Sequence, residues 1–150
     1  MTTPTRVRNV VWAAVGVSVG MLVGSSPVLA QDSPHTKVPL AQVKEEVTSR
    51  KAVLVDVREP AEWERGHVQG AILLPLSKLK SWETREPTDA EKAELFKALP
   101  QGSVAYTHCA AGVRSMAGGK ILRKLGYDAR PLKPGYKALV EAGFPNVEGK

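Results

Sequence analysis

The stretch that most constrains the fold runs from Ser103 to Leu125 and contains the only cysteine of the chain, Cys109. Residues 103–107 are rich in β-branched and aromatic side chains, which predicts a buried strand. From Ser115 onward the pattern suits a helix, and only a few small residues separate the two. The expected local structure is therefore a strand that turns sharply into a helix, with the cysteine at the turn.

This turn has the properties of an anion-binding site. The first backbone N–H groups of a helix lack intrahelical partners and lie at the positive end of the helix dipole. The small residues Ala110, Ala111 and Gly112 let the backbone curl around one point, and Gly112 can adopt a positive φ. The same donors stabilise a cysteine thiolate, and Arg114 adds a positive charge. The stretch predicts a nucleophilic sulfur beside a small anion.

A lone cysteine is more often a small buried apolar side chain than a nucleophile. Here Cys109 is followed by a turn of small residues, an arginine and the start of a helix. An apolar core position requires none of these, so the sequence favours the reactive interpretation.

Residues 109–115, Cys-Ala-Ala-Gly-Val-Arg-Ser, resemble the active-site loop of the rhodanese (sulfurtransferase) family, Cys-x-x-Gly-x-Arg-Ser. Residues 56–71 resemble the first signature of that family, Asp-Val-Arg-x-x-x-Glu-[aromatic]-x-x-Gly-His-[apolar]-x-Gly-Ala. The resemblance extends from about Leu40 to Pro145, the size of one domain. The chain is thus identified as similar to a single-domain, exported rhodanese.

The resemblance implies a sulfurtransferase in which the Cys109 thiolate attacks the outer sulfur of thiosulfate or a related sulfane donor. A persulfide forms, and an acceptor such as cyanide, sulfite or a thiol removes the terminal sulfur. This is covalent catalysis in a preorganised cradle, and it implies no cofactor and no metal. The implied site consists of Cys109 as the catalytic residue, Ala110, Ala111, Gly112, Val113, Arg114, Ser115 and Arg58 as substrate-binding residues, and Asp56 as a supporting residue.

Asp56 and Arg58 follow a predicted buried strand, residues 52–57, and the carboxyl ends of parallel strands are where sites form. The resemblance places Arg58 near the loop and Asp56 below it. The alternative is that the two side chains simply pair with each other, since buried charges usually do. For His67 we expect a structural hydrogen bond rather than a role as general base.

Other functions remain open. Phosphatases and arsenate reductases of related fold have five residues between cysteine and arginine, whereas four separate Cys109 from Arg114. The shorter loop suits sulfur better than a tetrahedral phosphate. A persulfide carrier that serves a partner protein would have the same loop. An inactive module typically lacks the cysteine, which this chain retains.

Alternating strands and helices predict an α/β, rhodanese-like three-layer fold with a mostly parallel central sheet of about five strands and helices on both faces. Four strands are expected at residues 52–57, 71–74, 103–107 and 128–132, and the resemblance adds a fifth near Lys37. The family usually has Gly-Gly and, four residues later, a Trp, where this chain has Pro134-Gly135 and Leu139. That difference concerns the shape of one pocket wall.

Residues 1–30 have the layout of a secretory signal peptide. Arg6 and Arg8 precede an apolar stretch, residues 10–23, which at about 14 residues is shorter than the roughly 20 needed to span a bilayer. We expect cleavage near Ala30 and an exported, periplasmic or secreted protein; an uncleaved anchor is the alternative. Residues 31–38 are then a flexible leader, 39–146 the rhodanese-like domain and 147–150 a C-terminal tail. A single cysteine in an oxidising compartment fits a functional role.

The net charge of +6 does not by itself indicate nucleic acid, because Lys and Arg are scattered along the chain. The expected partners are a small-molecule sulfur donor and acceptor, with a protein thiol as a further candidate acceptor. We expect no nucleic-acid partner and no stable membrane insertion after signal cleavage.

Overall fold

The structure, a computed structural model, describes residues 35–149, so the predicted signal peptide lies outside the described residues. In chain order the elements are α1 (Leu40–Thr48), β1 (Ala52–Asp56), α2 (Pro60–Glu64), β2 (Gly66–Val68), β3 (Ile72–Leu73), α3 (Leu76–Thr84), α4 (Asp89–Ala98), β4 (Val104–His108), α5 (Val113–Lys124), β5 (Asp128–Pro131), α6 (Tyr136–Glu141) and β6 (Asn146–Glu148). Among the described residues, no helix has both the length and the apolar character needed to cross a membrane.

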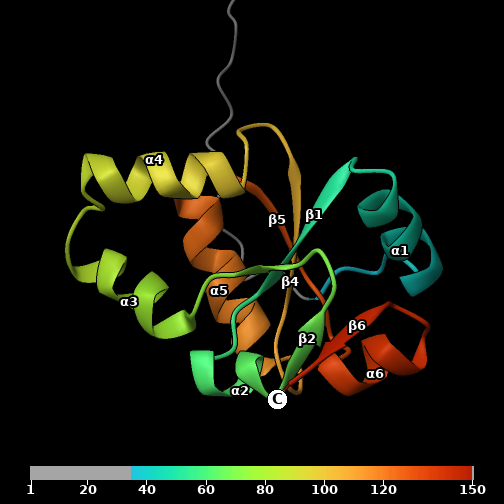
Figure 1. The fold of residues 1–150 in the computed structure, drawn as a ribbon. Helices are drawn as coiled ribbons and strands as arrows, with labels where there is room; N and C mark the ends of the chain where they lie inside the picture. Colours follow the sequence, from blue (N-terminus) through green and yellow to red (C-terminus); the bar gives the residue numbers. More distant parts are fainter. Residues whose placement is uncertain (1–34, 150) are drawn as a thin grey trace, which may run out of the picture.

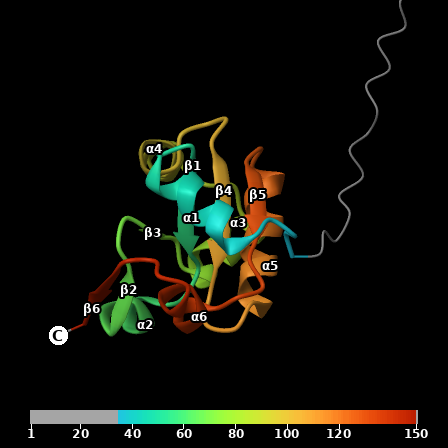
Figure 2. The same cartoon turned by 90° about the vertical axis from the view of Figure 1, so that its right-hand side faces the viewer.

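The central sheet contains four strands in the order β3-β1-β4-β5 (Figure 2), and all three pairings are parallel. Its two inner strands, β1 and β4, run in register from Ala52 opposite Val104 to Asp56 opposite His108. Because the strands are parallel, their carboxyl ends meet at one edge of the sheet. β2 and β6 form a separate antiparallel ribbon.

Helices cover both faces of the sheet, which gives the predicted three layers (Figure 1). α3, α4 and α5 lie on one side, and α1 and α6 lie on the other. Each face of the sheet has its own cluster of buried apolar side chains, and successive side chains of the inner strands alternate between the two. Val55 and Ala105 belong to one cluster, and Leu54 and Tyr106 belong to the other. Both faces are buried, which explains why these strands read as continuous apolar runs.

The predicted fifth strand near Lys37 is wrong for the described chain, whose central sheet has four strands. The Thr36 N–H does bond to the Pro131 carbonyl at 2.7 Å. The pairing stops there because the Val38 N–H bonds back to Thr36 Oγ1 and Pro39 has no N–H to donate. At the other end, residues 147 and 148, expected in a tail, belong to β6.

Two large apolar side chains on the helices are exposed, Phe96 of α4 by 54% and Met116 of α5 by 36%. The buried stripe of α4 passes through Leu95, and the next residue lies about 100° further around a helix. Gly118 of α5, by contrast, packs closely against β1 and the residue that follows it, since an added Cβ would lie 2.8 Å from a methyl group of Val57.

Candidate active site

Cys109 immediately follows β4, at the edge of the sheet where the parallel strands end. Gly112, three residues later, is the N-cap of α5 and has a φ of 89°. The prediction of a strand that turns into a helix through a left-handed glycine is therefore confirmed. The turn brings the N–H of the N-cap residue, Gly112, toward the cysteine.

The Cys109 thiol is 1% exposed and accepts a hydrogen bond from the Gly112 N–H, with 3.1 Å between Sγ and N. Its backbone carbonyl accepts a second bond, from the Tyr136 N–H at 2.8 Å. Cys109 also packs against the core, as a buried apolar side chain would. The inward-pointing N–H distinguishes the site, because it stabilises negative charge on the sulfur.

Two glycines are required because another segment crosses the loop at close range. A Cβ on Gly112 would lie 2.4 Å from the Lys133 carbonyl oxygen, and one on Gly135 would lie 1.7 Å from that of Ala110. Here the chain keeps the second glycine of the family pattern although Pro134 and Leu139 depart from it. The approach of residues 133–135 fixes the path of the loop.

Arg114 forms a bidentate ion pair with Glu62 of α2, with N–O distances of 2.5 and 2.8 Å. α2 lies at the amino end of α5 (Figure 1). Arg114 holds the pKa of Glu62 down at about 2, and Glu62 raises the pKa of Arg114. The cation predicted to attract an anionic donor is therefore paired with a carboxylate. Sequence reasoning included Glu62 in the first motif but assigned it no partner.

Arg58 and Asp56 form the ion pair that was the alternative to a direct role of Arg58 at the loop. They are 5% and 0% exposed, and the closest N–O distance is 2.7 Å. Arg58 also donates to the Gly66 carbonyl at 2.8 Å and lies over the Tyr136 ring, 4.3 Å from its centroid. In this structure Arg58 supports the scaffold below the loop, where Asp56 was predicted to act.

His108 is a buried neighbour of Cys109 that sequence reasoning did not select. Burial lowers the pKa of His108, while Asp56, with Oδ2 3.6 Å from Nε2, opposes that shift. Among the described residues, neither ring nitrogen has a hydrogen-bond partner. The ring is therefore neutral at pH 7 and adds no positive charge beneath the sulfur.

The other predicted site residues line the turn in different ways. Ser115 is fully buried, and its Oγ lies 2.5 Å from the Gly112 carbonyl oxygen and 2.7 Å from that of Leu132. Ala110 and Ala111 are exposed, and Val113 is 72% exposed at the mouth of the loop. His67 has the structural role expected of it, because its ring stacks on Trp63 and its Nδ1 lies 3.2 Å from the Trp63 carbonyl oxygen.

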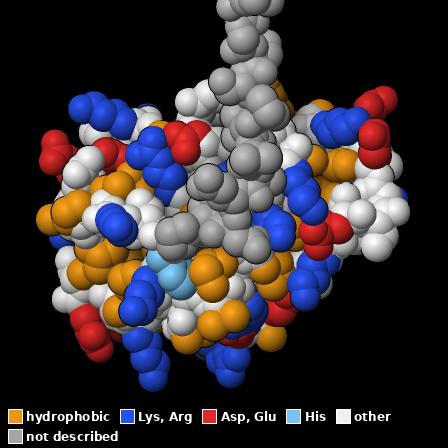
Figure 3. All heavy atoms as spheres, turned by 180° about the vertical axis from the view of Figure 1, so that it is seen from behind, with side chains coloured by type: hydrophobic (Ala, Val, Ile, Leu, Met, Phe, Trp, Pro, Cys, Tyr) orange, Lys and Arg blue, Asp and Glu red, His pale blue; other side chains and the backbone are white. Residues whose placement is uncertain are grey.

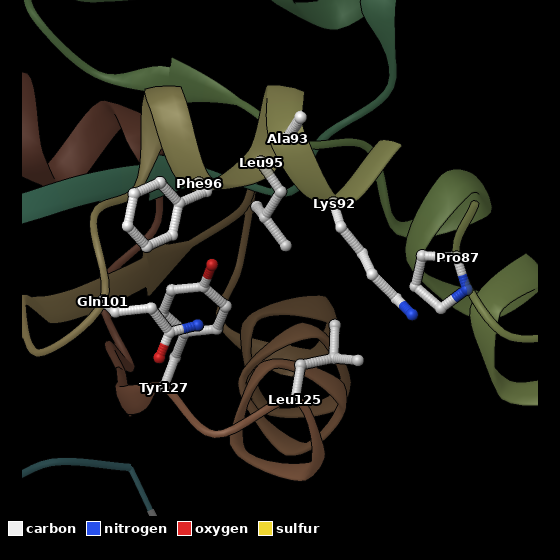
Figure 4. A pocket seen from close by; sticks show the side chains of 8 residues that line it. All are labelled: Pro87, Lys92, Ala93, Leu95, Phe96, Gln101, Leu125 and Tyr127. Atoms are coloured by element: carbon white, nitrogen blue, oxygen red, sulfur yellow. The ribbon is translucent and has the colours of Figure 1, made fainter. Parts of the chain in front are cut away.

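An apolar groove of about 470 Å³ lies between α4 and α5 (Figure 4). It is lined by Pro87, Lys92, Ala93, Leu95, Phe96, Gln101, Leu125 and Tyr127, and so by no residue of the Cys109 loop.

In the described part of the chain, no group of three or more His, Cys, Asp and Glu side chains is placed to hold a metal ion. Lys and Arg side chains are dispersed over the face shown in Figure 3. The Cys109 loop is therefore the candidate active site.

Glu62→Gln is expected to lower the free energy of unfolding by about 1 kcal/mol at pH 7, since the amide loses the charge facing Arg114. The pKa of Glu62 falls from 4.5 to about 2 on folding, so the pair contributes fully above pH 4.5 and its contribution is lost as the pH falls toward 2. Urea unfolding should therefore show a difference in the free energy of unfolding between Glu62→Gln and wild type that is constant down to about pH 4.5 and becomes smaller below that pH.

Glu86→Gln is a matched control for this measurement, because Glu86 is 93% exposed and lies 3.9 Å from Lys92. It is expected to have almost no effect at any pH. A Glu62→Gln difference that stays constant down to about pH 3 would contradict the assigned ion pair.

Comparison with known proteins agrees with this site. The family model described as "Rhodanese-like domain" matches residues 39–142. The chain is 34% identical over 101 residues to the probable adenylyltransferase/sulfurtransferase MoeZ of Mycobacterium tuberculosis, covering 67% of this chain and 23% of MoeZ. It is 39% identical over 89 residues to the uncharacterized protein YqhL of Bacillus subtilis, covering 59% and 60%. The chain thus spans only about a quarter of the length of MoeZ.

Solved structures give the same assignment. The human single-domain sulfurtransferase TSTD1 superposes with a TM-score of 0.59 at 27% identity, covering 73% of this chain and 96% of TSTD1. A rhodanese-related protein of Thermoplasma volcanium gives a TM-score of 0.56 at 27% identity, covering 73% and 95%. Because the matched region includes both the parallel sheet and the whole Cys109 loop, the chain belongs to the rhodanese-like domain family.

Proposed function

We propose that the chain is a sulfurtransferase that moves a sulfane sulfur from thiosulfate, or a related donor, to a thiophilic acceptor through a persulfide on Cys109. The observation that carries this proposal is the Gly112 N–H directed at Cys109 Sγ. This N–H lies at the amino end of α5. The cation in the first turn of α5, Arg114, is already paired with Glu62, so the backbone donors are the groups that stabilise a negative charge on the sulfur.

The reaction balances without a cofactor. The Cys109 thiolate attacks the outer sulfur of thiosulfate, a new S–S bond forms, and the original S–S bond breaks as sulfite leaves with its electron pair. The terminal sulfur of the persulfide carries the negative charge, which the backbone N–H groups of the loop stabilise. Cyanide, sulfite or a thiolate then attacks that sulfur and regenerates the Cys109 thiolate.

The surrounding ion pairs keep the loop in this conformation. The Arg114–Glu62 pair joins the first turn of α5 to α2, and the Asp56–Arg58 pair lies below β4. Rigid neighbours of this kind hold donors in place before charge develops, which is the main requirement of electrostatic catalysis.

A persulfide carrier that serves a partner protein is the second candidate function. It is favoured by the two exposed apolar side chains on the first turn of α5, Val113 (72%) and Met116 (36%). They lie next to the mouth of the loop, where a protein thiol acceptor would contact the domain.

We also propose that the protein is exported through the signal peptide expected at residues 1–30.

The test is the intact mass of the protein after incubation with thiosulfate, with and without cyanide. We expect a gain of one sulfur atom, which cyanide removes. No gain in protein shown to have a free thiol would contradict thiosulfate as the donor. Transfer from a persulfidated protein would then identify the carrier, and hydrolysis of an aryl phosphate would identify the phosphatase alternative.

A further inference from the structure

His35 reaches the active-site loop from a distant part of the chain. Its Nε2 lies 2.9 Å from the carbonyl oxygen of Gly112, 77 positions away in sequence. The backbone next to it is held on β5, since the Thr36 N–H donates to the Pro131 carbonyl at 2.7 Å. Figure 2 shows this segment passing β5 before it enters α1. The imidazole is thus fixed at the loop by the sheet.

The residue that His35 contacts is the one that donates to the sulfur. The Gly112 N–H bonds to Cys109 Sγ, and the Gly112 carbonyl faces His35. The described chain has no cis peptide bond, so the N–H of Val113 points opposite to that carbonyl. Holding the carbonyl toward His35 therefore sets the direction of the Val113 N–H, and the φ and ψ angles of Gly112 connect this peptide unit to the one that carries the Gly112 N–H.

Ser115 cannot supply this restraint alone. Its Oγ lies close to two carbonyl oxygens, those of Gly112 and Leu132, but a hydroxyl has only one proton to donate. The carbonyl of Gly112 accepts from His35 Nε2 whether the imidazole is protonated or in the neutral Nε2–H tautomer. His35 can therefore donate to the Gly112 carbonyl while Ser115 Oγ donates to the Leu132 carbonyl.

We infer that His35 is a positioning residue for the cysteine: by binding the Gly112 carbonyl it holds the Gly112 N–H on Cys109 Sγ. This inference rests on the proposed sulfur transfer at Cys109 and deepens it. The hydrogen bond of His35 is made to Gly112 and not to the sulfur. Its effect passes through Gly112, and it adds to the restraint that Ser115 Oγ and the close approach of Lys133 already place on that residue.

The test compares His35→Ala and His35→Gln with the wild-type chain, since the glutamine amide can restore an N–H at the position of Nε2. We expect His35→Ala to slow sulfur uptake at saturating thiosulfate about fivefold, the loss expected for one hydrogen bond. It should slow alkylation of Cys109 by iodoacetamide by a similar factor, and His35→Gln should recover to within about twofold of wild type. His67→Gln, in the histidine stacked on Trp63, should change neither rate.

Each result decides the matter. The inference is overturned if His35→Ala matches wild type in both rates, or if His35→Gln is as slow as His35→Ala. If the wild-type chain takes up no sulfur but His35→Ala still slows alkylation and His35→Gln restores it, the proposed function fails and the positioning role stands. Thermal unfolding of each variant checks that the rates are compared between folded proteins.

Discussion

Replacing Cys109 by serine is expected to abolish sulfur uptake from thiosulfate, with a loss of at least about a thousandfold. A serine hydroxyl is almost fully protonated at neutral pH and forms no persulfide, whereas a thiolate is a strong nucleophile. The site itself should survive, because serine is close to cysteine in size and can still accept the Gly112 N–H. Intact mass after incubation with thiosulfate measures the result directly.

The control for this variant is its free energy of unfolding, which should fall by no more than about 3 kcal/mol, the cost of burying a hydroxyl in the place of the thiol. The chain has no second cysteine, so no other thiol can take up the sulfur. A mass gain in folded Cys109→Ser that cyanide removes would therefore contradict the proposed persulfide.

Asp56→Ala is expected to lower the free energy of unfolding by about 3–5 kcal/mol, because it leaves the buried guanidinium of Arg58 without its carboxylate. Asp56 is 0% and Arg58 5% exposed, so water cannot replace the lost partner. Denaturant unfolding measures the change. If the variant still folds, the persulfide site should also lose activity, since Asp56 lies opposite His108 in the sheet register.

The chain contains a matched control in Asp128→Ala. Asp128 and Arg130 have the same Asp-x-Arg spacing and a similar closest distance, 2.8 Å, but are 52% and 37% exposed. Exposed pairs contribute at most about 1 kcal/mol, so this variant should be nearly neutral. Equal losses in the two variants would show that burial is not the cause of the large effect.

Much of the active site could be predicted because its determinants are local. The turn from β4 into α5 depends on small residues around Gly112 and on a backbone angle that glycine adopts readily. The start of α4 is equally local: the Thr88 side chain accepts the Glu91 N–H, and the Glu91 carboxylate accepts the Thr88 N–H. Such features depend on neighbours within a few residues, which a sequence displays directly.

Partners of charged side chains could not be predicted in the same way. Arg114 was assigned no partner within the chain, but it forms an ion pair with Glu62, 52 positions away, and the pairing of Arg58 with Asp56 was only one of two alternatives. A charged residue has the same sequence signature whether it faces solvent, a ligand or a carboxylate. Only the docking of α2 against the start of α5 decides among these.

The sequence by itself determined the alternation of strands and helices, the place of Cys109 at the end of a strand and the glycine turn that follows it, because each follows from periodicity or from the conformational freedom of individual residues. Tertiary structure alone decided that the central sheet has four strands, that Glu62 neutralises Arg114 and that His35 holds the Gly112 carbonyl. The physical reason is that these contacts join segments whose distance in space depends on how whole layers pack, while a hydrogen bond needs its donor and acceptor about 3 Å apart and an ion pair weakens as its charges separate.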